Sequence, residues 1–151
     1  MIQNDRISEH FSLRELTRSA IALRHGIINR PDGRAIAHLT RLAENILEPV
    51  RQNFGVPFSP SSGFRAPQVN RLAGSKPASQ HITGQAADFE IPTIANPILA
   101  EWIRDNLVFD QLILEFHRMD DAKSGWVHCS YHMGQNRNQC LIFDGISYEA
   151  F

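Results

Sequence analysis

The sequence predicts an α+β fold with a single domain, in which N-terminal helices pack on a small antiparallel sheet. Apolar residues at helical spacing dominate the first part of the chain, and short alternating segments dominate the last part. The length of 151 residues suffices for one hydrophobic core, and no internal repeat or long linker divides the chain. Residues 1–151 are therefore expected to form one domain.

Two N-terminal segments carry helix signals. Ser12-Leu13-Arg14-Glu15 has the pattern of a capping box, so a short helix should begin there, with Phe11 packed in front of it. Between Arg34 and Phe54, apolar residues recur at helical spacing and predict one long helix with a buried face. Pro49 is expected to bend this helix or mark a boundary, and Gly55 to end it.

The middle of the chain mixes helices and strands. Ala66-Pro67 predicts a brief helix that ends near Gly74, because proline is favoured at the first helical position. The segment Ala86–Ile91 alternates in polarity and predicts a strand. Asn96-Pro97 has the pattern of a cap followed by a helix start, and the apolar residues after it form a helical stripe.

The last third of the chain is expected to supply the rest of the sheet. Two strands are predicted at Asp110–His117 and Trp126–His132, joined by a polar loop. A further pair is predicted at Gln139–Phe143 and Ile146–Tyr148, around the hairpin signal Asp144-Gly145. Most of these strands follow the helices in sequence, which favours α+β over an alternating α/β order.

The composition narrows the class of protein. The formal net charge of -1 gives no strong field toward nucleic acid or a membrane surface, and no segment approaches the roughly 18 apolar residues of a membrane span. The polar residues 1–6 contain no signal-peptide core, so the protein is expected to be made as a soluble cytoplasmic product. Cys129 and Cys140 are expected to be reduced and partly buried, although a single bridge between them stays open.

Three residues have the chemistry of a metal site. His81 precedes Asp88 by seven positions, and His128 lies on a probable core strand where an unpaired imidazole would be costly. Two imidazoles and one carboxylate are a ligand set that leaves the fourth position of zinc open, as in catalytic sites. The alternative is a surface histidine and a turn-capping carboxylate, but Gly84 allows a turn that returns the His81 loop toward Asp88. If the three side chains converge, a hydrolase is expected.

The predicted hairpin offers a general base for that site. If the loop comprises residues 118–125, His117 stands opposite Trp126 and Glu115 stands opposite His128. Glu115 would then lie beside a ligating imidazole, where a base that activates the attacking water belongs. A slip of one residue would send Glu115 to the other face. The expected orientation is supported by three apolar neighbours that should point into the core, Leu112, Leu114 and Phe116.

Other side chains are candidates for substrate contact. Arg65 could hold a substrate carboxylate or polarise the scissile carbonyl, or it could form a structural salt bridge. His117 could orient a ligand or stabilise an oxyanion, and Trp126 could form a wall of the core or of a pocket. With Ser79 and Gln80, these two complete the predicted substrate-binding set. The remaining histidines are expected to be structural or solvated; they are His10, His25, His38 and His132.

Several segments together resemble the M15 zinc peptidases. They are Ser61-Ser62-Gly63-Phe64-Arg65, Val69-Asn70, Ser79-Gln80-His81-x-x-Gly84-x-Ala86-x-Asp88 and Trp126-Val127-His128-x-Ser130-Tyr131. The opening His10-Phe11-Ser12-Leu13-x-Glu15-Leu16-Thr17-x-Ser19 adds to the likeness, which covers residues 8–135. The branch it is most similar to is the phage-associated one, the relatives of D-alanyl-D-alanine carboxypeptidases.

The resemblance implies an α+β domain with zinc held by His81, Asp88 and His128, and with Arg65 near the substrate. It also implies cleavage of peptide bonds in the stem peptides of bacterial peptidoglycan.

The chain departs from the family pattern at one position. In many members the acid/base carboxylate lies three residues before the last histidine, where this chain has Gly125. The predicted hairpin places Glu115 beside His128, so Glu115 is the predicted replacement. Asp120 or Asp121 is the alternative if the loop folds over the metal.

These observations predict a zinc-dependent carboxypeptidase or endopeptidase for peptidoglycan, of the kind used in cell-wall lysis or remodelling. The enzyme would reach the wall after release or as part of a phage particle. The expected partners are peptidoglycan peptides, without nucleic acid or membrane insertion. Two alternatives stay open: a non-catalytic wall-binding or virion-assembly domain that keeps the zinc, and a zinc-free structural protein with chance motifs.

Overall fold

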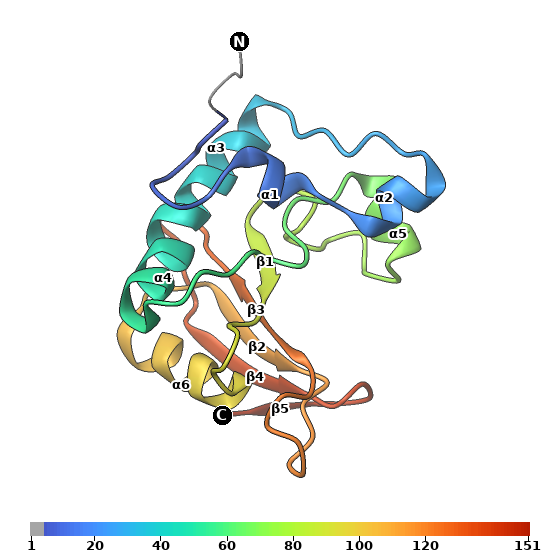
Figure 1. Ribbon diagram of the computed structural model, residues 1–151. Coiled ribbons are helices and arrows are strands. Elements are labelled where there is room, and N and C mark those ends of the chain that lie inside the picture. Colours follow the sequence, from blue (N-terminus) through green and yellow to red (C-terminus); the bar gives the residue numbers. More distant parts are fainter. Residues whose placement is uncertain (1–4) are drawn as a thin grey trace.

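Most helices come first along the chain and the strands follow, with one helix between the first two strands, which confirms the α+β prediction (Figure 1). The computed structural model describes residues 5–151. The helices are α1 (Leu13–Thr17), α2 (Ala20–His25), α3 (Gly33–Leu42), a π-helical turn (Ala43–Leu47), α4 (Glu48–Phe54), α5 (Pro67–Leu72) and α6 (Asn96–Asn106). The strands are β1 (Ala86–Phe89), β2 (Gln111–Glu115), β3 (Trp126–Ser130), β4 (Gln139–Phe143) and β5 (Tyr148–Ala150).

The predicted long helix is continuous but not uniform. α3 passes through the π-helical turn directly into α4, and Pro49 is the second residue of α4. Proline lacks an N–H and its ring crowds the carbonyl four residues earlier, so a widened turn immediately before it relieves both problems. Gly55 ends α4 in the left-handed conformation, with φ of 68°. The predicted capping box is also present, with Ser12 and Glu15 capping each other's backbone N–H groups.

The sheet has the strand order β1-β3-β2-β4-β5 and is mixed. β3 pairs antiparallel with both β1 and β2, and β5 pairs antiparallel with β4. β4, however, runs parallel to β2, so the prediction of a wholly antiparallel sheet is wrong at this one junction. The predicted hairpin of the last two strands is confirmed, although its second strand is Tyr148–Ala150. The connection between β3 and β4 is long enough to cross the sheet. β4 therefore pairs with the edge of β2 that faces away from β3 and runs parallel to β2.

The two faces of the sheet have different surroundings. Helices α3, α4 and α6 lie along one side of it (Figure 1), and that side buries the alternate apolar residues of the inner strands. Among them are Leu112, Leu114, Val127 and Cys129, all at most 2% exposed. Phe116 was expected to join them, but its positive φ of 54° turns it out of the alternation and leaves it 43% exposed. The opposite face carries Asp88 and His128, which are directly paired.

Polar side chains outside the core hold the N-terminal segment and the β2–β3 loop in place through hydrogen bonds. Glu48 on α4 accepts hydrogen bonds from the Ser8 hydroxyl and from the backbone and ring of His10, which ties the N-terminal segment to the helix. Asn96 was expected to cap α6 but is its first residue, and its amide instead donates to Glu90 and to carbonyls of the β2–β3 loop. One residue of difference in the helix start frees this side chain for tertiary contacts.

The structure also tests the predicted state of the two cysteines and the predicted absence of a membrane span. Cys129 and Cys140 are free thiols, the first buried and the second half-buried, as expected. Among residues 5–151, no helix combines the length and the apolar character needed to cross a membrane. The predicted lack of a signal peptide falls largely on residues 1–4, which lie outside the described part of the chain.

Candidate metal centre

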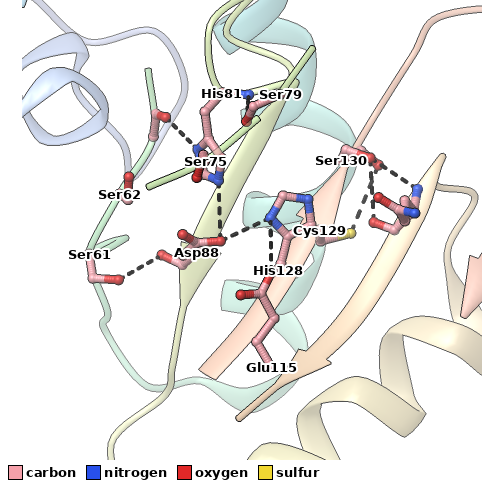
Figure 2. Close-up of polar contacts among 12 residues, drawn as sticks. Ser61, Ser62, Ser75, Ser79, His81, Asp88, Glu115, His128, Cys129 and Ser130 are labelled. Atoms are coloured by element: carbon pink, nitrogen blue, oxygen red, sulfur yellow. Dashed lines mark hydrogen bonds and ion pairs between the residues drawn. The ribbon is translucent and has the colours of Figure 1, made fainter. Parts of the chain in front are cut away.

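His81, Asp88 and His128 converge on the face of the sheet opposite to helices α3, α4 and α6, which we call the open face (Figure 2). Asp88 on β1 and His128 on β3 are directly paired across the antiparallel ladder, so their side chains point to the same side. His81 comes from the turn before β1, and its ring approaches the same carboxylate. All three residues are buried, with exposed fractions of 3%, 6% and 8%.

The turn that carries His81 is fixed by its neighbours. His81 Nδ1 lies 2.7 Å from the carbonyl oxygen of Gly63, a contact that only a protonated Nδ1 can make, so Nε2 is left as the free lone-pair donor. The backbone N–H of Arg65 donates to the carbonyl of His81 at 3.0 Å. Gly84 has φ of 77°, and a Cβ there would lie 2.6 Å from the carbonyl oxygen of Ala35. The tight turn expected at Gly84 is thus required for packing on α3.

The geometry of the three donor atoms fits a zinc ion. His81 Nε2 lies 3.3 Å and His128 Nδ1 lies 3.0 Å from the same oxygen, Oδ1 of Asp88. All three donor atoms lie within 4.8 Å of one another. Zinc bonds of about 2.0–2.1 Å in a tetrahedron place neighbouring ligand atoms about 3.3 Å apart. Each imidazole nitrogen therefore stands at ligand separation from the carboxylate oxygen.

Electrostatics set the protonation of this group. Burial, together with the charges of His128 and Arg65, lowers the pKa of His81 against the opposing effect of the adjacent Asp88 carboxylate. Burial opposes ionisation of Asp88, but the charges and hydrogen bonds of the two histidines hold its pKa well below the usual range. For His128, burial is outweighed by the hydrogen bond and charge of Asp88 and by the charge of Glu115, so its pKa is raised. An ionised Asp88 and a neutral His81 have the protonation that metal coordination requires, whereas a metal ion would have to displace the proton that the raised pKa favours on His128.

Glu115 reaches the site, although by a different register from the one predicted. β2 and β3 pair Glu115 with Trp126 and Ile113 with His128, so the expected pairings of Glu115 with His128 and of His117 with Trp126 are wrong by two residues. A shift of two residues keeps the face, and Glu115 Oε1 still lies 3.9 Å from His128 Nδ1 (Figure 2). The shift arises because the loop begins earlier, at Phe116. Burial raises the pKa of Glu115.

The backbone around Gly125 leaves no room for a side chain, so the acid/base carboxylate cannot lie at this position, three residues before the last histidine. It has φ of 70°, and a Cβ at this residue would lie 1.8 Å from the carbonyl oxygen of Glu115. The alternative bases lie elsewhere: Asp120 and Asp121 form ion pairs with Arg118 within the loop. Among the described carboxylates, Asp88 and Glu115 alone lie within 4 Å of a ring nitrogen of His128.

Arg65 is engaged by the protein on every side of its guanidinium. Nη2 donates to Asp88 Oδ2 at 3.1 Å, Nε to Ser62 Oγ at 2.9 Å, and Nη1 to Ser75 Oγ at 2.9 Å. The side chain is only 13% exposed. These contacts orient the second oxygen of Asp88 and leave Oδ1 for the histidines. The predicted salt bridge is therefore present, and a direct role of Arg65 on substrate stays a prediction.

The predicted substrate-binding residues have different surroundings. Ser79 Oγ accepts from the backbone N–H of His81 at 3.3 Å. Gln80 donates to Asp110 Oδ2 at 2.8 Å, which engages its amide away from the metal group. His117 Nδ1 lies 3.4 Å from the carbonyl oxygen of Ser124 within the loop. Trp126 is half-buried and is paired with Glu115 across the two strands. Their roles in substrate binding stay predictions.

The contacts that support the site were not visible in the sequence. The carbonyl of Gly63 and the hydroxyls of Ser62 and Ser75 belong to residue types that occur anywhere, and only the fold brings them to His81 and Arg65. Asp110 is different, because a carboxylate in front of an apolar strand signals a buried ion pair. It is 4% exposed.

Comparison with known proteins agrees with this geometry. A family model described as Peptidase M15 matches residues 9–130. The chain belongs to the peptidase M15 family. Membership makes the protein a metallopeptidase, and zinc is the general cofactor of this family. A search of curated proteins found no match.

Proposed function

We propose that this M15 peptidase hydrolyses peptide bonds in the stem peptides of bacterial peptidoglycan, as a zinc-dependent carboxypeptidase or endopeptidase. The observation that carries the proposal is the Glu115 carboxylate, 3.9 Å from His128 and on the same face of the sheet. A ligand set with an adjacent, partly buried carboxylate has the composition of a hydrolytic site and not of a closed structural one.

The chain would hold zinc through His81 Nε2, Asp88 Oδ1 and His128 Nδ1. When bound, zinc supplies a Lewis acid that polarises the scissile carbonyl and lowers the pKa of water. Gly63 and Arg65 orient two of these ligands, which keeps the donor atoms converged.

Glu115 would move the proton. Burial raises the pKa of Glu115 toward the working pH. The carboxylate is therefore a better base for the attacking water, and after protonation it can act as the general acid. The proton would pass to the nitrogen of the leaving amine as the C–N bond breaks. His81 is held by the contact of its other ring nitrogen, Nδ1, with the carbonyl of Gly63 and need not move during this transfer.

Mass spectrometry of muropeptides tests the proposal. Purified protein should hold about one zinc ion per chain, and incubation with peptidoglycan should release peptides with new amino groups. The masses of the products identify the bond and distinguish a carboxypeptidase from an endopeptidase. Zinc without any new amino group would favour the non-catalytic alternative, a wall-binding or virion-assembly domain.

A further inference from the structure

A row of four side chains crosses the open face of the sheet beside the metal group. Glu115 on β2 is paired with Trp126 on β3 and with Phe143 on β4, and Phe143 is paired with Tyr148 on β5. Directly paired residues of a sheet point to the same face, so the four side chains form one line. The line is the next row after the one that holds Asp88 and His128, and Glu115 belongs to both the line and the proposed catalytic group.

The aromatic members of this row pack against one another through Phe116. The ring centroid of Phe116 lies 5.0 Å from that of Trp126 and 5.3 Å from that of Phe143. Phe143 in turn stacks on Tyr148 at 4.4 Å, with 20° between the ring planes. The positive φ of Phe116 turns its ring to this face of the sheet. We name these four residues, Phe116, Trp126, Phe143 and Tyr148, the aromatic platform.

The aromatic platform does not belong to the hydrophobic core. None of its four members is in the core cluster or packed against it. Tyr148 is 53% exposed and Phe116 is 43% exposed. The other two members, Trp126 and Phe143, are half-buried. Contiguous and partly exposed rings mark a contact surface more often than single exposed residues do. Each ring is held by its neighbour, so a ligand meets a surface that is already ordered.

Half of the aromatic platform lies outside the segment that the family model matches. The match ends at residue 130, whereas Phe143 and Tyr148 lie on β4 and β5. The two further strands therefore extend the open face of the M15 domain away from Glu115. A surface at that place is continuous with the site where the scissile bond would lie.

We infer that the aromatic platform binds sugar rings of the glycan to which the stem peptides are attached. This inference rests on the proposed function, because it makes the platform a continuation of the same substrate site. One face of a pyranose ring presents C–H groups, which pack on the electron-rich face of an aromatic ring, while its hydroxyl groups stay in water. The platform has no charged member, and a neutral, flat and partly apolar partner such as an N-acetylated sugar matches it.

A pair of substrates tests the inference kinetically. The double variant Phe143→Ala/Tyr148→Ala should raise KM for glycan-linked stem peptide by about three- to tenfold relative to KM for the free peptide. The value of kcat should change little on either substrate. Tyr148→Phe, which keeps the ring, should behave like wild type, and so should Leu23→Ala, which removes an 86% exposed side chain on α2. Equal changes on both substrates, or none, would overturn the inference.

A binding experiment tests it without turnover. The sequence has two tryptophans, and Trp102→Phe leaves Trp126 as the sole reporter. Titration with an oligosaccharide of N-acetylglucosamine should shift the fluorescence of Trp126, and the shift should weaken in Tyr148→Ala and return in Tyr148→Phe. Absence of a shift in the Trp102→Phe protein would refute sugar binding. If the sugar binds and no peptide bond is cut, the proposed function fails while this inference stands.

Discussion

The Oε1 atom of Glu115 lies 3.9 Å from Nδ1 of His128, and a diagonal relationship across two strands produces this distance. Glu115 is paired with Trp126, two residues before His128, on the same face of the sheet. The carboxylate therefore approaches the metal group along the sheet surface and not from the loop that precedes the last histidine. If Glu115 is the general base, its function rests on the place of the carboxylate beside the metal group and not on its position in the sequence.

The first prediction concerns Glu115 itself. Glu115→Gln keeps the size of the side chain and removes its ability to accept and return a proton. Turnover of peptidoglycan should fall by about 10²- to 10⁴-fold while zinc content stays near that of wild type. Elemental analysis and release of amino groups measure the two quantities on the same sample.

The loop carboxylates provide the matched control. The double variant Asp120→Asn/Asp121→Asn removes two charges that are paired with Arg118 in the loop. It should retain most of the wild-type turnover. A large loss in this variant with full activity in Glu115→Gln would place the base in the loop instead.

Gly125 carries the second prediction. Gly125→Ala should destabilise the protein by at least about 1–3 kcal/mol, because both the left-handed backbone and the close approach to the Glu115 carbonyl exclude a side chain. Gly134→Ala is the control: it has φ of 84° but no heavy atom within 4 Å of the added Cβ. Urea unfolding should show the larger loss for Gly125→Ala. Equal losses would mean that the close approach has no energetic effect.

The convergence of the three candidate ligands could be predicted from the sequence, and the register of β2 on β3 could not. His81, Asp88 and His128 could be found because their residue types, spacing and flanking strand pattern point to one chemistry. The face of Glu115 followed from the period of two in a strand, which survives a shift by two residues. The loop length did not follow, because Phe116 leaves the strand with a positive φ that no local signal indicated. Bulky aromatic residues rarely adopt that conformation.

The pairing of strands that are far apart in the chain could not be predicted from the sequence either. The parallel contact of β4 with β2 depends on where the segment after β3 crosses, and its residues show the same alternation in either direction. The hydrogen bonds that hold Arg65 beside the metal group could not be predicted for a similar reason. Ser62 and Ser75 reach Arg65 only because two loops meet over β1, at one edge of the sheet.

Arg65 gives a third prediction that separates two roles. If its task is to orient Asp88, Arg65→Ala should weaken zinc binding by about 10- to 100-fold, measured by competition with a chelator. Arg65→Lys should restore part of this affinity, since it keeps the charge but not the forked contacts with Ser62 and Asp88. Unchanged zinc affinity combined with a lower kcat would instead place Arg65 on the substrate.

Asp110 links the turn that carries His81 to the segment that precedes β4. Its Oδ1 accepts from the backbone N–H and Nε of Arg137 at 3.1 and 2.9 Å. Its Oδ2 accepts from Arg137 Nη2 at 3.0 Å and from Gln80 at 2.8 Å. Hydrogen bonds from Arg137, chiefly from its side chain, lower the pKa of Asp110 to about 2 against opposing burial. Gln80 directly precedes His81, so this carboxylate also steadies the turn that presents the first histidine.

The fourth prediction follows from the sign of that shift. A carboxyl whose pKa is lower in the folded protein than in the unfolded chain stabilises the fold above its unfolded value, here 3.8, and this contribution is lost as the pH falls toward about 2. Asp110→Asn should therefore lower the free energy of unfolding at pH 7 by about 1–3 kcal/mol. The difference from wild type should shrink between pH 4 and pH 2. Urea unfolding of the chelator-treated proteins measures it, with the exposed Asp105→Asn as control. A difference that stays constant over this range would show that Asp110 acts through packing and not through its charge.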